Sequence, residues 1–473
     1  MKNLSWKETT SIGLMLFALF FGAGNMIFPP SLGQAAGTHF WAAIAGFIVT
    51  GVGLPLLGVI AIAISGENLQ SLGGRVHPVF GVVFTTIVYL SIGPVFAIPR
   101  TGTVAFEMGA APLLPEGMKS GGWSLFLYTL VYFAITLWLS LNPTKLVDRI
   151  GKILTPLLLI TIAVISIQGI VHPIGPLEPP AEAYQSAPFF GGFVQGYLTM
   201  DAIAALVFGI VVITAVQERG VKERKQLALT TLKAAVIAAI GLALVYIALG
   251  YLGASSRSAV GATENGGQIL TAVTSFLFGS PGTILLGAAI TLACLTTSVG
   301  LVTSCGQYFS RLFPKLSYKA VVCVMCLFSL GVANLGLTQI ISFSVPLLMV
   351  IYPLAIVLII LSIFHPIVKG SPGVYLGALV GTALVSVGDG LQQLSLQPDW
   401  LLAAYDKLPF YAERIGWLLP ALAGGLLGCV FEGTGKRRAW VLPALVGRLL
   451  GCVFGRAKKQ RATDASTETR KIG

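Results

Sequence analysis

Apolar residues occur along this chain in long runs, separated by short segments rich in polar residues, glycine and proline. The runs are roughly 18 to 30 residues long, which is the length that a helix needs to cross the hydrocarbon core of a bilayer. Backbone amides inside lipid have no water to bond, so each run is predicted to be helical. We expect an all-α polytopic membrane protein with about twelve transmembrane helices. The predicted spans are residues 10–33, 40–65, 79–111, 123–141, 150–171, 189–216, 227–252, 280–309, 320–335, 337–364, 371–388 and 412–431.

Composition supports the same class of protein. Of the 473 residues, 55% are hydrophobic and 10% are charged, whereas soluble proteins carry about 25% charged residues. A single water-soluble core of this size would also be unusual, because cores stop growing beyond about 300 residues. The sequence has no HExxH pattern, paired carboxylates or nucleophile elbow within its spans, so we predict that the protein is not an enzyme.

The formal net charge of +12 reflects how lysine and arginine are divided between the two sides of the membrane. With the N-terminus in the cytoplasm, the outer loops hold only Lys119, Arg257, Lys407 and Arg414, and Arg100 lies inside a span. The other basic residues fall in the N-terminus, the inner loops and the C-terminal tail. This positive-inside bias predicts a multi-pass protein of the bacterial inner (plasma) membrane with both termini in the cytoplasm. It accounts for the charge without a nucleic-acid partner, and the lipid bilayer is the expected surroundings.

Two predicted spans contain residues that disfavour a continuous helix. The first span reads FFGAGN at residues 20–25, and the sixth reads TMD at residues 199–201 after several glycines. Glycine costs about 1 kcal/mol relative to alanine inside a helix. Asn25 and Asp201 must also find polar partners at membrane depth. Glycine is common in closely packed membrane helices, so close helix contact is the alternative interpretation of each segment.

The positions of the two disrupted spans favour a functional interpretation. If spans one to five (residues 10–171) and spans six to ten (residues 189–364) are two copies, the odd number of spans in each gives them inverted topology. The disrupted spans then occupy matching places, which is the best sequence indication of a transporter's substrate site. Two further helices, residues 371–388 and 412–431, follow the repeats.

The domain organisation is one transmembrane carrier domain, residues 1–433, followed by a basic tail, residues 434–473. The tail contains a near-repeat of residues 419–431 at residues 442–454, in which Arg448 replaces a glycine. A central arginine makes this copy a poor membrane span. A segment lying on the inner leaflet and a local duplication with no role of its own both remain open.

Four separated motifs resemble the bacterial branched-chain amino acid carriers, the BrnQ or LIVCS family. They are FALFFGAGNMIFPP at residues 17–30, GPVFAIPRT at 93–101, GYLTMDA at 196–202 and LACLTTSVG at 292–300. The motifs fall in order, and only the duplicated tail departs from the family pattern. The resemblance implies a symporter that imports leucine, isoleucine and valine by alternating access, driven by a sodium or proton gradient. It also implies the leucine-transporter-like (LeuT-like) fold, a 5+5 inverted repeat with discontinuous helices one and six.

The resemblance further implies where the ligands bind. In the LeuT-like fold, backbone amides of the broken first helix meet the substrate carboxylate. The expected substrate-binding residues are Gly22, Ala23, Gly24, Asn25, Thr199 and Asp201. First-helix carbonyls and a threonine pair on the eighth helix form a sodium site in that fold. The corresponding residues are Ala18, Phe21, Ala293, Thr296 and Thr297.

The chemistry of these residue types agrees with those roles but leaves alternatives open. A helix broken in the membrane offers free N–H groups for a carboxylate and free carbonyls for a cation. A threonine in a membrane helix also commonly bonds to its own helix carbonyl. Asp201, inside a span, should be paired, protonated, or bound to a cation or substrate amine, and a structural hydrogen bond is the alternative. Arg100 and Glu107, seven residues apart, lie on one helical face and are expected to form an ion pair or bracket an outer gate.

Several choices stay open at this point. No cofactor is expected, and the coupling ion is sodium or a proton: Thr296 and Thr297 favour sodium, whereas Asp201 and Glu107 permit a proton. The alternative substrate is another small neutral amino acid, such as alanine or threonine. An ion channel is the alternative from another class, although the sequence has no ring-forming filter motif. The sequence makes no prediction of oligomeric state.

Overall fold

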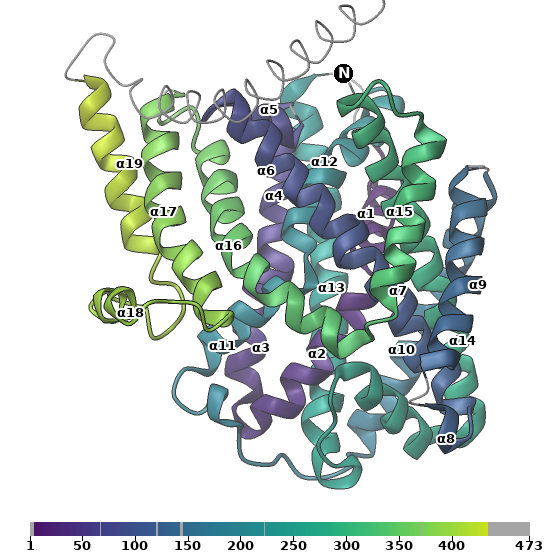
Figure 1. The fold of residues 1–473 in the computed structure, drawn as a ribbon. Coiled ribbons are helices and arrows are strands. Elements are labelled where there is room, and N and C mark those ends of the chain that lie inside the picture. Colours follow the sequence, from purple (N-terminus) through teal and green to yellow (C-terminus); the bar gives the residue numbers. More distant parts are fainter. Residues whose placement is uncertain are drawn as a thin grey trace, which may run out of the picture.

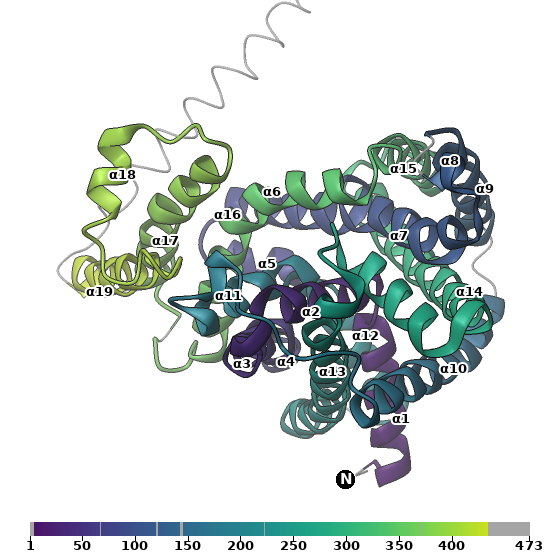
Figure 2. The ribbon, with the colours of Figure 1, turned by 90° about the horizontal axis from the view of Figure 1, so that it is seen from below.

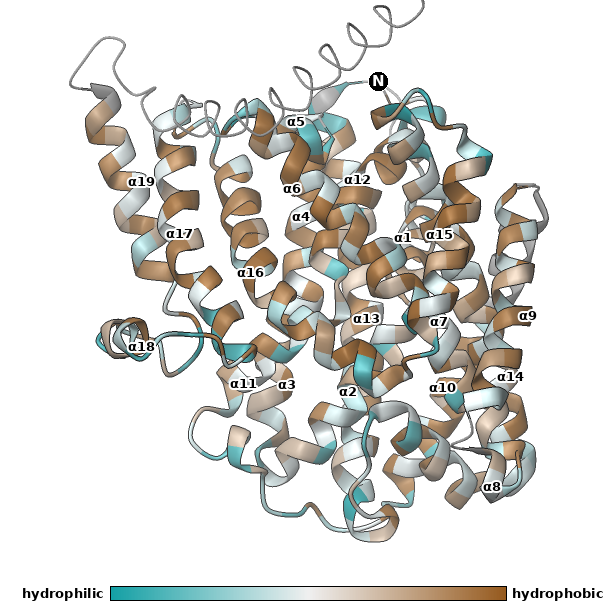
Figure 3. Ribbon diagram, in the orientation of Figure 1, coloured by the Kyte–Doolittle hydropathy of each residue, from teal (hydrophilic) through white to brown (hydrophobic). Residues whose placement is uncertain are grey.

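The computed structural model describes residues 4–66, 68–119, 122–141, 145–221, 223–368 and 370–433. Every regular element in this part of the chain is a helix, so the predicted all-α class is confirmed. Most helices stand side by side across the molecule (Figure 1). Their middles are dominated by apolar residues, and polar residues gather mainly at the helix ends and in the connecting loops (Figure 3). The predicted basic tail, with its near-repeat, lies outside the described residues.

The first five predicted spans correspond to a longer series of helical segments. The first span consists of α1 (Trp6–Phe20) and α2 (Ala23–Ala36), with two non-helical residues between them. The second span consists of α3 (Phe40–Ile48), η2 (Val49–Gly53) and α4 (Leu54–Ser65). The third consists of α6 (Pro78–Leu90), η3 (Ser91–Val95), α7 (Ala97–Ala105) and η4 (Phe106–Ala110). The fourth is α9 (Gly122–Leu141), and the fifth is α10 (Lys145–Val171). Short helices α5 (Leu69–Gly74) and α8 (Glu116–Lys119) lie between spans.

The sixth span is also divided. It consists of α11 (Pro188–Gln195), the 3₁₀ turn η7 (Gly196–Thr199) and α12 (Asp201–Glu218), which are joined at Met200. The following helices are α13 (Arg224–Val260), α14 (Gly266–Leu312), α15 (Tyr318–Ala333), α16 (Leu337–Ile363), α17 (Pro372–Gln393), α18 (Asp399–Tyr405) and α19 (Leu418–Gly433). Seen from below, α17, α18 and α19 lie to one side of the other helices, next to α16 (Figure 2).

Three predicted boundaries need correction. The span predicted at 227–252 continues to Val260 in α13. The span predicted at 280–309 is the second part of α14, which begins at Gly266 and kinks at Gly279, where φ is 63°. The apolar run before this kink is too short to cross a bilayer, which is why the hydrophobic pattern missed it. The last helix begins at Leu418 rather than at 412, because the preceding residues form turns.

The number of spans stays a prediction. Among the described residues, eight helical segments are long and apolar enough to cross a membrane, and three more apolar helices are shorter. Helix α1 falls below that length because the first span is interrupted after Phe20, whereas α2 is counted with α3 and α4 in one long segment, Ala23–Ser65. Large apolar side chains such as Trp123, Val324 and Leu426 are exposed, as expected for surfaces that face lipid rather than water.

Glycine allows the first broken helix to lie directly against α13. A Cβ on Gly33 of α2 would lie 1.8 Å from the Gly250 carbonyl oxygen, and one on Gly253 would lie 2.1 Å from the Pro30 carbonyl oxygen. Membrane helices associate through such close contacts between small residues, because lipid provides no hydrophobic drive for helix association. This packing fixes α2 against α13, and the site described below depends on both helices.

We predict that Gly33→Ala lowers the melting temperature of the detergent-solubilised protein, because the new methyl group must displace the backbone of α13. Overpacking of this kind costs about 1–3 kcal/mol. Gly331→Ala in α15 is the matched control, since a Cβ there meets nothing within 4 Å. The control gains the higher helix propensity of alanine, so its melting temperature should stay unchanged or rise. Equal melting temperatures for the two variants would contradict the packing argument.

Candidate functional site

The break in the first span places the C-terminal end of α1 and the N-terminal end of α2 inside the bundle. Helix α1 ends at Phe20, and α2 begins at Ala23 after Phe21 and Gly22. The last carbonyls of α1 and the first N–H groups of α2 have no partners within their own helices. The Asn25 side chain satisfies one neighbouring group, because its Oδ1 accepts a hydrogen bond from the Gly22 N–H at 3.0 Å. Backbone groups that can bind a ligand therefore remain at the break.

The sixth span is broken at Met200, whose φ of 65° lies in the left-handed region. This conformation is uncommon for a residue other than glycine and ends η7 before α12 begins. The Thr199 hydroxyl donates to the Gly196 carbonyl at 2.9 Å and accepts from the Asp201 N–H at 3.3 Å. Thr199 thus satisfies local backbone groups, and Asp201 occupies the first turn of α12, where the helix dipole favours a negative charge.

A buried hydrogen-bonded triangle joins the two breaks. Asn25 Nδ2 donates to Asp201 Oδ2 at 2.6 Å and also contacts the Tyr246 hydroxyl of α13. The Tyr246 hydroxyl in turn donates to the same carboxylate oxygen at 2.8 Å. All three side chains are at most 3% exposed. An isolated carboxylate at this depth would be costly, so the triangle explains how Asp201 is retained and also fixes the two breaks relative to each other.

Arg100 reaches the same region from α7. The third span kinks at Gly93, which has non-helical angles, and Pro94 follows. Helix α7 then restarts with a hydrogen bond from the Arg100 N–H to the Phe96 carbonyl. The guanidinium Nη1 and Nη2 donate to the carbonyls of Leu198 and Thr199, at 2.7 and 3.4 Å. Arg100 therefore satisfies carbonyls at the end of the first half of helix six, where the dipole favours a cation.

Residues of the expected sodium site lie between α1 and α14. A Cβ on Gly22 would lie 3.2 Å from Thr297 Cγ2 and 3.5 Å from Thr297 Oγ1, so the first break abuts the threonine pair. The Thr296 and Thr297 hydroxyls both donate to the Ala293 carbonyl, at 2.9 and 3.0 Å. That is the bond that membrane threonines commonly form. It uses the hydroxyl hydrogens and leaves oxygen lone pairs that can face a cation.

A cavity of about 1110 Å³ connects these groups with the face of the molecule that bears the N-terminus. Its inner end is lined by Gly22, Ala23, Gly24, Asn25, Arg100, Thr199 and Asp201, and by Ala18, Thr296 and Thr297. Its mouth includes Trp6 and Lys7 at the start of α1. Apolar residues, among them Ala97, Ala204 and Phe208, form part of the wall. The site thus combines unpaired helix ends, one buried anion, one buried cation and an apolar wall.

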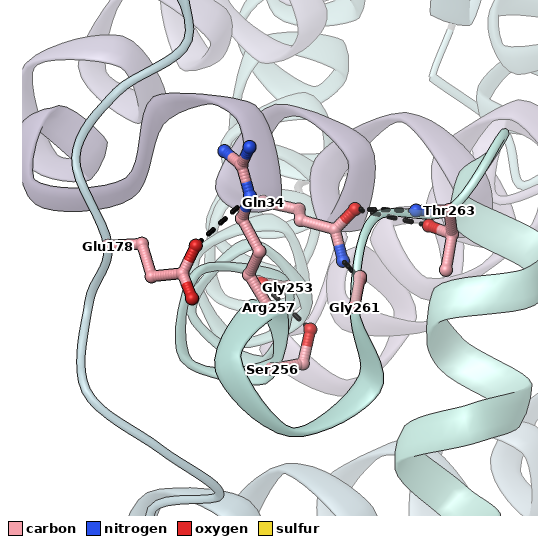
Figure 4. Close-up of polar contacts among 7 residues, drawn as sticks. All are labelled: Gln34, Glu178, Gly253, Ser256, Arg257, Gly261 and Thr263. Carbon is pink, nitrogen blue, oxygen red and sulfur yellow. Dashed lines mark hydrogen bonds and ion pairs between the residues drawn. The ribbon is translucent and has the colours of Figure 1, made fainter.

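The opposite face is covered by loops that polar contacts hold onto α2 (Figure 4). Gln34 near the end of α2 donates to the Gly261 carbonyl at 3.1 Å. Its Oε1 accepts from the N–H and the hydroxyl of Thr263, at 3.3 and 3.1 Å. An ion pair of 3.2 Å joins Arg257, in the last turn of α13, to Glu178 in the α10–α11 loop. We call these contacts of Gln34, Gly261, Thr263, Arg257 and Glu178 the outer clasp.

Glu107 belongs to this cover rather than to the centre of the site. It accepts a hydrogen bond of 2.8 Å from Asn265, which also caps the start of α14. Within the described residues Arg100 and Glu107 form no ion pair, and each has its own partners. Their seven-residue spacing suggested one helical face, but η4, a wide π-helical turn, begins at Phe106 and changes the angular spacing between them.

Most of the expected site residues come together, and a few do not. Phe21 and Ala293 are absent from the cavity lining, although each lies beside residues that form it. Tyr246 was missed by the sequence analysis. The available signal was a tyrosine inside the apolar run 227–252, because a buried tyrosine hydroxyl usually has a hydrogen-bond partner.

The fold and site together define a class of protein. The structure is similar to that of Mhp1, a nucleobase-cation-symport-1 family transporter with a LeuT-like fold. The inward-facing conformation of Mhp1 matches with a TM-score of 0.63 at 15% identity, covering 90% of each chain. A closed conformation with bromovinylhydantoin bound matches with a TM-score of 0.57 at 16% identity, covering 89% of this chain and 91% of that one. The protein is a multi-pass membrane protein of LeuT-like fold.

The family follows from the sequence comparisons. Residues 5–434 match the family model described as branched-chain amino acid transport protein, and the chain belongs to this family. It is 54% identical to the branched-chain amino acid permease BraB of Bacillus subtilis, over 90% of this chain and 96% of that protein. It is 49% identical to the branched-chain amino acid transport system 2 carrier protein of Pseudomonas aeruginosa, over 91% and 98%.

These relatives confirm the resemblance that the four motifs indicated. The relatives are permeases and carriers, so the chain is a transporter and not an enzyme. It is a multi-pass protein of the bacterial inner membrane.

We predict that Tyr246→Phe lowers the melting temperature, because Asp201 and Asn25 each lose a buried hydrogen-bond partner. A buried group left unsatisfied costs about 1–3 kcal/mol. Tyr251→Phe, on the same helix, is the matched control: its ring packs against Phe40, and no side-chain hydrogen bond of its hydroxyl is described. An equal effect of the two substitutions would show that the triangle contributes nothing beyond ring packing.

We predict that Gln34→Leu, which keeps the size of the side chain but loses three hydrogen bonds, increases access from the face covered by the outer clasp. A Ser31→Cys reporter, in a background without the native cysteines, lies in the adjoining pocket of about 340 Å³. Its maleimide labelling should be faster in the Gln34→Leu variant than in the parent. Gln185→Leu, an exposed residue of the α10–α11 loop, serves as the control. Labelling that does not change would mean that Gln34 does not restrain the cover.

Proposed function

We propose that the protein is a secondary symporter that imports leucine, isoleucine and valine by alternating access, coupled to a sodium or proton gradient. The observation that carries this proposal is the meeting of two broken helices at the closed end of a cavity that opens on one face. The cavity reaches the face that bears the N-terminus, and no residue of the outer clasp lines it. Access from one side suits a carrier, whereas a channel needs a continuous path. The names of the relatives support branched-chain amino acids as the substrates.

The two ends of an amino acid zwitterion fit the two breaks. The free N–H groups of Ala23 and Gly24, at the positive end of α2, suit the carboxylate. The Asp201 carboxylate suits the ammonium group, since it lines the cavity within hydrogen-bonding distance of Asn25 on α2. Neutralising both charges is necessary, because each desolvated charge costs several kcal/mol unless it has a partner.

The apolar wall suits a branched aliphatic side chain. Burying a leucine-sized side chain contributes about 1.5–3 kcal/mol. One methylene more or less changes binding by only about 10- to 200-fold. A wall that includes Ala97, Ala204 and Phe208 is therefore expected to accept leucine, isoleucine and valine together.

Coupling rests on the groups between α1 and α14. Carbonyls at the end of α1, including those of Ala18 and Phe21, together with Ala293, Thr296 and Thr297 supply neutral oxygens of the kind that a hard cation prefers. They favour sodium, whereas Asp201 is the group at the breaks that could carry a proton. One coupled positive charge gains about 2.3 kcal/mol per 100 mV of membrane potential. By the positive-inside rule, the cavity mouth faces the cytoplasm.

Uptake of labelled leucine into proteoliposomes, with the sodium gradient and the pH gradient imposed separately, tests the proposal. We expect stimulation by one of the two gradients and competition by isoleucine and valine. Asp201→Asn should reduce uptake at least about 10-fold, because the ammonium loses a charged partner. If sodium is the ion, Thr297→Ala should raise the sodium concentration needed for half-maximal uptake.

Thr214→Ala is the matched control, because Thr214 is exposed on α12 and bonds only to its own helix carbonyl at 3.0 Å. Its uptake should equal that of the parent protein. If neither gradient stimulates leucine uptake, the coupled mechanism is rejected. If alanine or threonine competes better than isoleucine, the substrate assignment is wrong.

A further inference from the structure

Arg100 is a buried cation whose charge the described protein groups only partly satisfy. It is 4% exposed. Its two described hydrogen bonds go to neutral carbonyls, those of Leu198 and Thr199. Within the described residues no carboxylate forms an ion pair with it, and its Nε is buried without a hydrogen-bond partner. Asp201 attracts the guanidinium electrostatically, but the described hydrogen bonds of its carboxylate go to Asn25 and Tyr246. The guanidinium therefore keeps N–H groups that can bind a further anion.

The guanidinium is positioned where the substrate carboxylate is proposed to bind. Its Cζ lies 5.2 Å from the centre of the Phe28 ring, on α2. A Cβ on Gly24 would lie 2.7 Å from Arg100 Nη2, so the absent side chain of Gly24 is what lets the guanidinium approach the first turn of α2. Both Gly24 and Arg100 line the cavity. An anion bound to the free N–H groups of this turn would therefore lie beside the arginine.

We propose that Arg100 binds the carboxylate of the transported amino acid, together with the first turn of α2. This inference rests on the proposed function and adds a charged donor to the backbone groups. Arginine suits the role because it stays protonated and presents several N–H groups in one plane. Arg100 and Asp201 then hold the two charges of the zwitterion from opposite sides. The two side chains together carry no net charge, and neither does the zwitterion that they bind.

The alternative is that Arg100 acts only as a cap for the end of η7. The two roles differ in ligand selectivity. A cap supports the whole site, so its loss should weaken the binding of every ligand to the same extent. A carboxylate-binding residue discriminates leucine from leucinamide, which keeps the ammonium and the side chain but has no carboxylate. Leucinamide carries a net positive charge, so removing the arginine should leave its binding unchanged or improve it.

Equilibrium binding of leucine and leucinamide to the purified full-length protein, measured by calorimetry, tests the proposal. We expect Arg100→Gln to raise the Kd for leucine about 10- to 100-fold, the effect of losing a charged hydrogen bond. The Kd for leucinamide should stay unchanged, within about threefold, or fall. Asp201→Asn is the reciprocal control, because it removes the partner of the ammonium group that both ligands share. It should therefore weaken both ligands.

Arg100→Lys keeps the charge but loses the planar fork, and it decides the question if Arg100→Gln does not yield a folded protein. Its selectivity for leucine over leucinamide should fall below that of the parent. Equal losses for both ligands, or unchanged selectivity in the folded variants, would overturn the carboxylate role. A parent protein that does not bind leucine would instead reject the proposed function, so the two failures are distinguishable.

Discussion

The structure depends on one constraint: backbone groups exposed inside a membrane must find partners. Interrupting a helix frees several N–H and carbonyl groups, and each unsatisfied group costs several kcal/mol in lipid. Here the interruptions are partly compensated by side chains. Asn25 accepts from the Gly22 N–H, Thr199 accepts from the Asp201 N–H, and Arg100 donates to two carbonyls of η7. The groups that remain lie along the cavity, where a polar solute can satisfy them.

Compensation also makes the two breaks depend on each other. Asn25 satisfies the first break with its carbonyl oxygen and binds Asp201 of the second with its amide nitrogen. Arg100 is bonded to the second break and lies against Gly24 of the first. Tyr246 ties both to α13, which packs closely on α2 through Gly33 and Gly253. A displacement of either half-helix therefore changes the binding geometry on both sides.

Much of this could be predicted from the sequence, because apolar length defines membrane helices and buried polar residues mark their interruptions. The segments FFGAGN and TMD gave the two breaks, and Asn25 and Asp201 were expected to need partners. The identities of those partners depend on tertiary packing: Tyr246 comes from a distant helix, and Arg100 bonds to backbone carbonyls that carry no sequence signal. The separate partners of Arg100 and Glu107 were not predictable from their seven-residue spacing, because η4 departs from the α-helical period.

The distribution of polar contacts indicates which part of the structure can open. The triangle of Asn25, Asp201 and Tyr246 is at most 3% exposed and joins α2, α12 and α13, so breaking it would separate the two helix breaks from each other. The outer clasp lies at loops near the surface, and Arg257 and Glu178 are about one third exposed. Water can replace such contacts, so each contributes only about 0.5–1.5 kcal/mol net. Alternating access is therefore expected to require release of the clasp while the central triangle stays intact, so that the site itself is preserved as its access changes.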